Sequence, residues 1–92
     1  MIVRILGVGQ FRLPDDAAAE LNRIDDDVQA AAESGDGEAF ARALRNLVDE
    51  VERLGQPVPP QELVGSDAIV PSPDTTLEEA KALLSAEGLI PD

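Results

Sequence analysis

Residues 15–54, DDAAAELNRIDDDVQAAAESGDGEAFARALRNLVDEVERL, decide the fold. They contain two stretches whose apolar residues recur at steps of three and four, as on one face of an α-helix. The breaker Ser34-Gly35-Asp36-Gly37 separates them, with Gly35 suited to a C-terminal cap and Asp36 to an N-terminal cap. Two helices joined by about four residues are expected to pack antiparallel as a helical hairpin. The expected buried positions are Ala17, Leu21, Ile24, Val28 and Ala31 in the first helix and Phe40, Leu44, Leu47, Val48, Val51 and Leu54 in the second.

The residues before the helical hairpin have the composition of β-strands. Ile2 to Leu6 is β-branched and apolar, and Gln10 to Leu13 alternates polar and apolar side chains. Gly7-Val8-Gly9 can supply the positive φ angles of a tight reversal. We therefore expect a β-hairpin at residues 2–13. Because its first strand is apolar at nearly every position, both faces of that strand are expected to be covered.

The residues after the helices are expected to form a Pro-rich connector at 55–73 and a C-terminal helix at 76–87. Ala68-Ile69-Val70 is the best strand candidate in the connector, and the flanking prolines restrict it to a sheet edge. Glu62-Leu63-Val64 is either a brief strand or a turn. A capping box of Thr75 with Glu78, or of Thr76 with Glu79, begins the last helix, and Gly88 is its expected cap. The predicted fold class is α+β, in a single small domain of residues 1–92.

The composition excludes more functions than it suggests. The chain has nineteen acidic residues against seven basic ones, for a net charge of −12, and it lacks His and Cys. Residues 14–54 carry −8 and residues 55–92 carry −6, whereas residues 1–13 contain Arg4, Arg12 and no acid. The negative electrostatic field of such a chain repels nucleic acid and anionic lipid and favours basic partners. With no leader-like segment and no apolar run of the ~20 residues that a membrane span needs, the expected location is the cytoplasm.

No combination of side chains in the sequence points to catalysis. The lack of His and Cys removes the usual relay partners of the serines. Gly7-Val8-Gly9 lacks the third glycine and the following helix of a phosphate-binding loop, so a hairpin turn explains it. Consecutive acids such as Asp15-Asp16 point about 100° apart on a helix and cannot converge on one ion. We therefore expect no enzyme activity, no cofactor and no metal site.

Six residues are candidates for contact with a partner protein. Three consecutive aspartates of the first helix are predicted to lie off its apolar stripe, on a solvated face that could contact a basic partner. The other three lie on the predicted hairpin, in the only region without acids. The two arginines among them either pair with acids from the helices or mark a docking edge, because an exposed strand is a template for β-pairing. The six candidates are Asp25, Asp26, Asp27, Arg4, Phe11 and Arg12.

Several stretches spread over the chain carry a family resemblance. They are MIVRILG at 1–7, GQFR at 9–12, LNRID at 21–25, ELV at 62–64 with SD at 66–67, and TLEE at 76–79 continuing to EGLIP at 87–91. In these stretches the chain resembles PspAA, a family of small proteins associated with phage shock protein A. The matching residues are turns, caps and strand cores, so the resemblance assigns no catalytic or binding residue.

The resemblance implies a partner role. PspAA proteins are encoded next to, or fused with, PspA-type coiled-coil proteins, which coat the inner face of a stressed cytoplasmic membrane. The first hypothesis is therefore a non-enzymatic adaptor that binds such a coiled coil and is recruited through it to the membrane. The alternatives are a homodimeric structural or regulatory module, paired through the edge strands of the hairpin, and a regulator that binds a small ligand or a metal.

Overall fold

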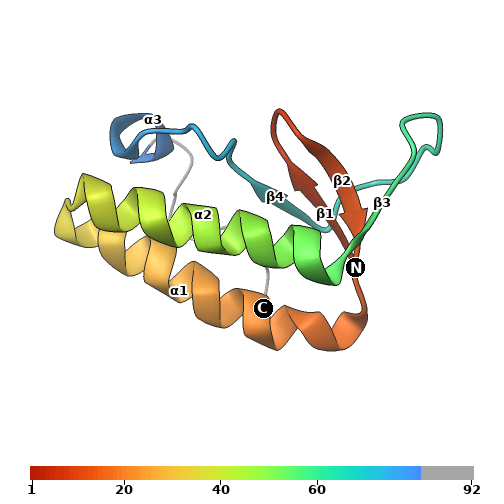
Figure 1. Ribbon diagram of the computed structural model, residues 1–92, viewed down its shortest axis with the longest axis horizontal. Helices are drawn as coiled ribbons and strands as arrows, with labels where there is room; N and C mark the ends of the chain where they lie inside the picture. The colour runs from red at the N-terminus through yellow and green to blue at the C-terminus, as the bar shows by residue number, and fades with distance from the viewer. Residues whose placement is uncertain (82–92) are drawn as a thin grey trace.

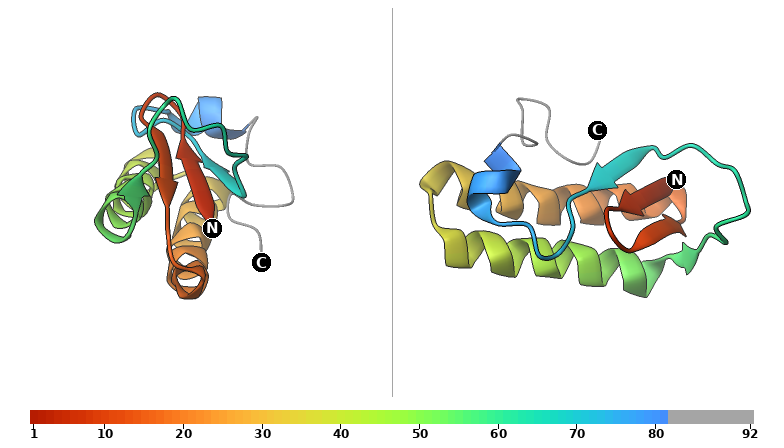
Figure 2. Two further views of the ribbon diagram at one scale, coloured as in Figure 1. Left: turned by 90° about the vertical axis from the view of Figure 1, so that its right-hand side faces the viewer. Right: turned by 90° about the horizontal axis from the view of Figure 1, so that it is seen from above.

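Two long helices lie against one face of a small mixed β-sheet (Figures 1 and 2). The structure, a computed structural model, describes residues 1–81. The predicted α+β fold, with an N-terminal hairpin, a helical hairpin and a short C-terminal helix, is confirmed. The elements in chain order are β1 (Ile2–Ile5), β2 (Gly9–Arg12), the 3-10 helix η1 (Asp15–Ala17), α1 (Ala18–Ser34), α2 (Gly37–Leu54), β3 (Gln56–Pro57), β4 (Ala68–Val70) and α3 (Leu77–Lys81).

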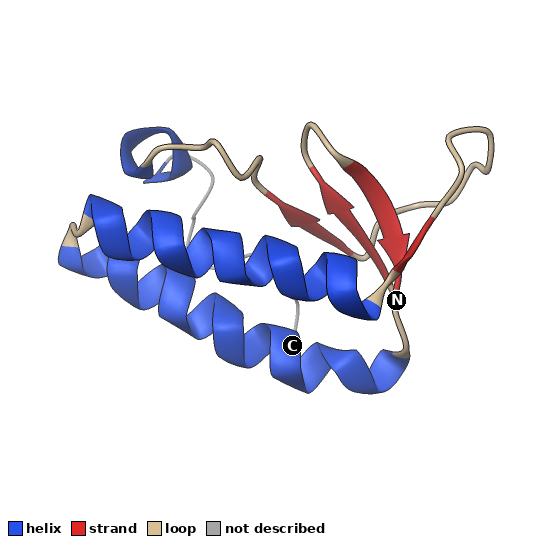
Figure 3. Ribbon diagram, viewed as in Figure 1, coloured by secondary structure: helices blue, strands red, loops and turns tan. Residues whose placement is uncertain are grey.

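The sheet has the strand order β3-β2-β1-β4, so both strands of the hairpin lie in its interior (Figure 3). β2 pairs antiparallel with β1 and with β3, whereas β4 pairs parallel with β1. The turn between β1 and β2 is tight because Gly7 and Gly9 take φ angles of 81° and 144°, which favour glycine. The predicted hairpin and the predicted edge strand at residues 68–70 are both confirmed.

Long-range hydrogen bonds hold the connector and β4 on the hairpin. The backbone N–H of Ile2 donates to Asp67 Oδ2 at 2.7 Å, and the backbone N–H of Asp67 donates to the Ile2 carbonyl at 2.7 Å. Gln10 Nε2 donates to the Val64 carbonyl at 3.1 Å and to Ser66 Oγ at 2.9 Å. The connector therefore crosses from one edge of the sheet to the other in contact with the hairpin, which makes the parallel pairing of β4 possible.

The edges of the sheet differ from the prediction. The sequence predicts a polyproline-like connector at residues 55–60, but Gln56–Pro57 pairs with β2 as β3. Proline is tolerated there because an edge strand needs no N–H group on its outer side. β3 and β4 thus occupy both edges of the hairpin, so its strands are already paired within the chain. The new edges are short and are interrupted by Pro57 and followed by Pro71, which makes them poor templates for pairing.

Among the residues that the structure describes, only one face of the sheet is buried. Val3 and Ile5 of β1 are completely buried, together with Phe11 of β2 and Val70 of β4, whereas Arg4 is exposed. The prediction that both faces of β1 are covered is therefore wrong. Side chains alternate between the faces of a strand, and the helices cover only one of these faces (Figure 2).

The apolar stripes of α1 and α2 form the other half of the core. Gly35 ends α1 in the left-handed conformation at a φ of 75°, and the Asp36 carboxylate accepts hydrogen bonds from the N–H groups of Glu38 and Ala39 at 3.1 and 3.0 Å. Both predicted caps are confirmed. Ile24 and Leu54 are only partly buried. The buried apolar residues of the helical segment are Ala17, Leu21, Val28, Ala31, Phe40, Ala43, Leu44, Leu47, Val48 and Val51.

α3 begins with a reciprocal capping box. The backbone N–H of Thr76 donates to Glu79 Oε1 at 3.0 Å, and the N–H of Glu79 donates to Thr76 Oγ1 at 3.2 Å. The bond from the Thr76 N–H is the main reason that the pKa of Glu79 is lowered, because it stabilises the carboxylate. Of the two boxes that the sequence offers, the one at Thr76 is formed. The rest of the helix predicted at 76–87, and its cap at Gly88, lie outside the described residues.

α2 ends directly against the hairpin at Gly55. A Cβ atom at this position would lie 2.8 Å from the Val51 carbonyl oxygen and 2.9 Å from Phe11 Cβ. It would also lie 3.2 Å from Leu13 Cγ. Both the backbone and the core thus exclude a side chain where the chain passes from helix to sheet.

Replacing Gly55 with Ala is expected to lower the free energy of unfolding by about 1–3 kcal/mol, because the new methyl group must displace core atoms. Gly37→Ala is the matched control, since a Cβ atom there meets nothing within 4 Å. At the start of α2 that change should stabilise the protein by up to about 1 kcal/mol. Urea denaturation measures both variants, and equal midpoints would contradict the close approach at Gly55.

Asp36→Ala is expected to lower the free energy of unfolding by about 1 kcal/mol, because two N–H groups at the start of α2 lose their acceptor. Asp49→Ala removes the same charge from an exposed position inside α2 and serves as control. Thermal unfolding followed by circular dichroism compares the two. If Asp49→Ala costs as much as Asp36→Ala, the cap is not the cause.

Candidate functional site

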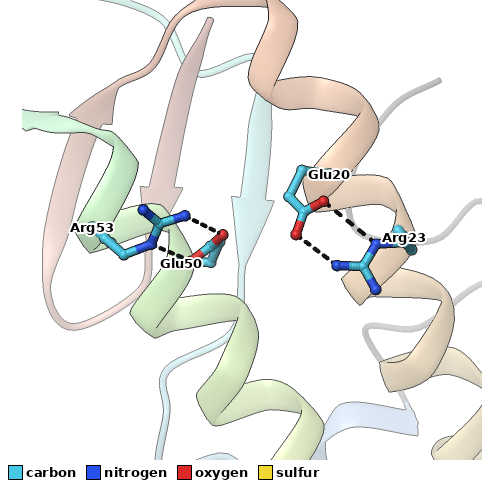
Figure 4. Close-up of polar contacts among 4 residues, drawn as sticks. All are labelled: Glu20, Arg23, Glu50 and Arg53. Carbon is cyan, nitrogen blue, oxygen red and sulfur yellow. Dashed lines mark hydrogen bonds and ion pairs between the residues drawn. The ribbon is translucent and has the colours of Figure 1, made fainter.

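The outward side of the helical hairpin carries ion pairs on both helices. On α1, Arg23 Nη2 lies 2.6 Å from Glu20 Oε1, and on α2, Arg53 Nη2 lies 2.7 Å from Glu50 Oε2. The partners of each pair are three residues apart, so they project from the same side of their helix. Figure 4 shows the pairs on neighbouring stretches of α1 and α2, with the strands behind the helices.

The two ion pairs also influence each other across the helices. Direct hydrogen bonding to Glu20 is the main reason that the pKa of Arg23 is raised, and bonding to Arg53 is the main reason that the pKa of Glu50 is lowered. Smaller electrostatic contributions act between the two helices: Glu50 raises the pKa of Arg23, and Glu20 raises the pKa of Arg53. The four side chains therefore form one cluster of alternating charge, which we call the seam cluster. The side chains of Arg23 and Arg53 are both exposed, so the cluster remains available for contact.

A shallow groove of about 350 Å³ continues along the two helices from the seam cluster toward the turn at residues 34–37. Half of its lining residues are alanines, whose short side chains would let the helix of another protein approach closely. Polar side chains border the alanines. The lining residues are Asp27, Ala30, Ala31, Ser34, Ala39, Arg42, Ala43 and Asn46.

The three candidate aspartates of α1 do not share one environment. Asp26 and Asp27 are exposed, as predicted, and Asp27 lines the groove. Asp25 is only 3% exposed, and its Oδ2 accepts a hydrogen bond from Gln29 Nε2 at 3.3 Å. The prediction that all three lie on a solvated face is wrong for Asp25, because it follows Leu21 by one helical turn and shares its buried side. This surface does not present Asp25 to a partner.

The three candidate residues on the hairpin also differ in their exposure and in their interaction partners. Arg12 is exposed and pairs with Glu62 of the connector at 3.2 Å, so its acidic partner does not come from a helix as expected. Arg4 is exposed in the middle of β1. Phe11 is 9% exposed and packs in the core, since it points to the inner face of β2, so its selection as a contact residue is not supported.

The seam cluster was not among the residues singled out from the sequence. Its signal is the pattern Glu-x-x-Arg, which occurs as ELNR at residues 20–23 and as EVER at residues 50–53. Each copy predicts an ion pair on one helix. That both pairs lie next to each other depends on the antiparallel packing of the helices.

Neither a metal centre nor a membrane span is found in the described part of the chain. Within residues 1–81, no group of three or more acidic residues is arranged to hold a metal ion. Over the same residues, no helix combines the length and apolar character needed to cross a membrane. The surface features that remain are the seam cluster, the groove and the free face of the sheet.

Comparison with known proteins places the chain in one family. Searches of curated proteins and of solved structures give no significant match. The model of the PspAA family, described as PspA-associated protein, matches residues 1–92. Since the match covers the entire sequence, from the hairpin to the residues beyond α3, the chain belongs to the PspAA family of PspA-associated proteins.

Proposed function

We propose that this protein is a non-enzymatic adaptor that binds a PspA-type coiled-coil protein and thereby modulates the envelope-stress response. The observation that carries the proposal is the open, charged outward side of the helical hairpin in a member of a PspA-associated family. Its role would be to present this surface rather than to transform a substrate.

The shape of the helical hairpin supports contact with a coiled coil. Two antiparallel helices with one free side can pack lengthwise against other helices, as in a four-helix arrangement. The groove lets a partner helix approach closely at one end. The seam cluster offers both signs of charge at the other end, where they can pair with the charged positions that flank a coiled-coil seam.

Charge favours a protein partner over direct lipid contact. The helical segment carries a net charge of −8 within a chain of −12. A body of this charge is repelled by anionic lipid, whereas basic side chains of a membrane-bound coiled coil would attract it. We therefore propose a cytoplasmic protein that reaches the inner face of the cell membrane through its partner. On that partner it would compete with lipid headgroups for basic residues.

The electrostatic part of this proposal predicts salt-sensitive binding. Asp26→Asn combined with Asp27→Asn should weaken binding to the purified PspA-type protein by roughly threefold to tenfold, because two exposed charges are lost. Titration calorimetry at several salt concentrations should also show a smaller dependence on salt for this variant. Asp74→Asn with Glu78→Gln removes two exposed charges near α3 and is the control. Binding affinity that does not change with salt concentration, or an equal loss of affinity in the control, would contradict contact at α1.

The groove can be tested separately from the charges. Ala30→Phe places a large side chain in the groove from an exposed position, and it is expected to weaken binding by about tenfold or more because the partner helix can no longer approach. Ala41→Phe makes the same change at an exposed position of α2 that does not line the groove. Surface plasmon resonance compares the two. Unchanged binding of Ala30→Phe would place the contact elsewhere.

A further inference from the structure

Exposed apolar side chains gather at the end of the sheet that holds the hairpin turn. Leu6, at the end of β1, is 38% exposed, Val8 in the hairpin turn is 49% exposed, and Ile69 on β4 is 51% exposed. Leu6 continues the ladder, since its N–H donates to the Val70 carbonyl at 3.0 Å, so its side chain follows the alternation and faces away from the core. Ile69 is far along the chain from Leu6 and Val8, and it lies beside β1 only because β4 pairs with that strand.

Arg4 lies among these apolar side chains. Its neighbours on the adjacent strands are Gln10 of β2 and Ile69 of β4, and neither of these residues is charged. Arg12 pairs with Glu62, whereas Arg4 forms no ion pair within residues 1–81. Arg4, Leu6, Val8 and Ile69 form what we call the turn-end patch. It places one uncompensated positive charge in an apolar surface, on a protein whose net charge is −12.

We infer that the turn-end patch is a docking surface for an amphipathic helix that carries a carboxylate beside its apolar side chains. This inference rests on the proposed function, because the helix is taken to belong to the coiled-coil partner. Adjacent strands lie about 4.8 Å apart and a helix is about 10 Å wide, so one helix laid along β1 and β4 covers the patch. Its apolar side chains would cover Leu6 and Ile69, and its carboxylate would pair with Arg4.

Charge argues against a second copy of this chain as the occupant. A symmetric dimer formed through the patch would place Arg4 opposite its own copy. It would also bring together two bodies of −12 each. An amphipathic helix that places one carboxylate opposite Arg4 avoids the first cost, and it avoids the second where the rest of the partner is basic, as proposed above. The patch lies on the side of the molecule opposite the seam cluster, so one adaptor would engage two separate helices of its partner.

Two substitutions test the patch in the full-length protein against the purified PspA-type coiled-coil protein. Ile69→Thr keeps a β-branched residue in β4 but removes apolar contact, and Arg4→Gln removes the charge. Each is expected to weaken binding by about fivefold or more, as for residues at the centre of a contact. Arg4→Gln should also reduce the salt dependence, since it removes a charge pair. Circular dichroism checks that both variants fold as the original protein does.

Leu63→Thr and Arg45→Gln are the matched controls. Leu63 is 95% exposed and lies outside the patch, and Arg45 is exposed on α2. Both controls should bind as the original protein does. Equal binding by all four variants would overturn the patch while leaving the adaptor function intact, whereas no binding by the original protein would overturn both. An original protein that is dimeric in sedimentation and becomes monomeric with Ile69→Thr would assign the patch to a second copy and overturn the inference.

Discussion

The fold depends on the burial of one sheet face against the apolar stripes of α1 and α2. A hairpin of four-residue strands is marginal in water, and two helices with apolar stripes also need a surface to cover them. Each half therefore stabilises the other. The junction at Gly55, where α2 ends on Phe11, brings the two halves into direct contact. Within residues 1–81, no further layer covers the outer side of the helices or of the sheet.

The two outer surfaces have opposite character. The outward side of the helices holds exposed acids, the seam cluster and a groove lined with alanine, whereas the free face of the sheet holds Arg4 among exposed apolar side chains. A small protein of two layers cannot bury both sides of both layers. Both surfaces belong to a member of the PspAA family of PspA-associated proteins. We propose that both serve recognition of a coiled-coil partner, on two sides of one adaptor.

The helical hairpin and its caps could be predicted residue by residue, because helical spacing and capping act within a few positions of the chain. Asp36 caps α2, Gly35 ends α1, and Thr76 pairs with Glu79 as the sequence indicates. The candidate site was predicted only in part. Asp26, Asp27, Arg4 and Arg12 are on the surface, but Asp25 and Phe11 are buried, since burial depends on which side of an element meets the rest of the fold. The proximity of the two ion pairs could not be found from spacing alone.

The sequence by itself determined the elements apart from β3, their order, the family and the strong negative charge. The tertiary structure decided how the strands are arranged: β4 lies parallel to β1, β3 covers the other edge of the hairpin, and the polar contacts of Gln10 and Asp67 hold the connector between them. It also decided that the hairpin has no free edge and that Leu6 and Ile69 share one surface. Local propensities cannot specify these features, because each depends on hydrogen bonds or packing between residues far apart in the chain, such as the bonds from Ile2 to Asp67 and from Gln10 to Val64.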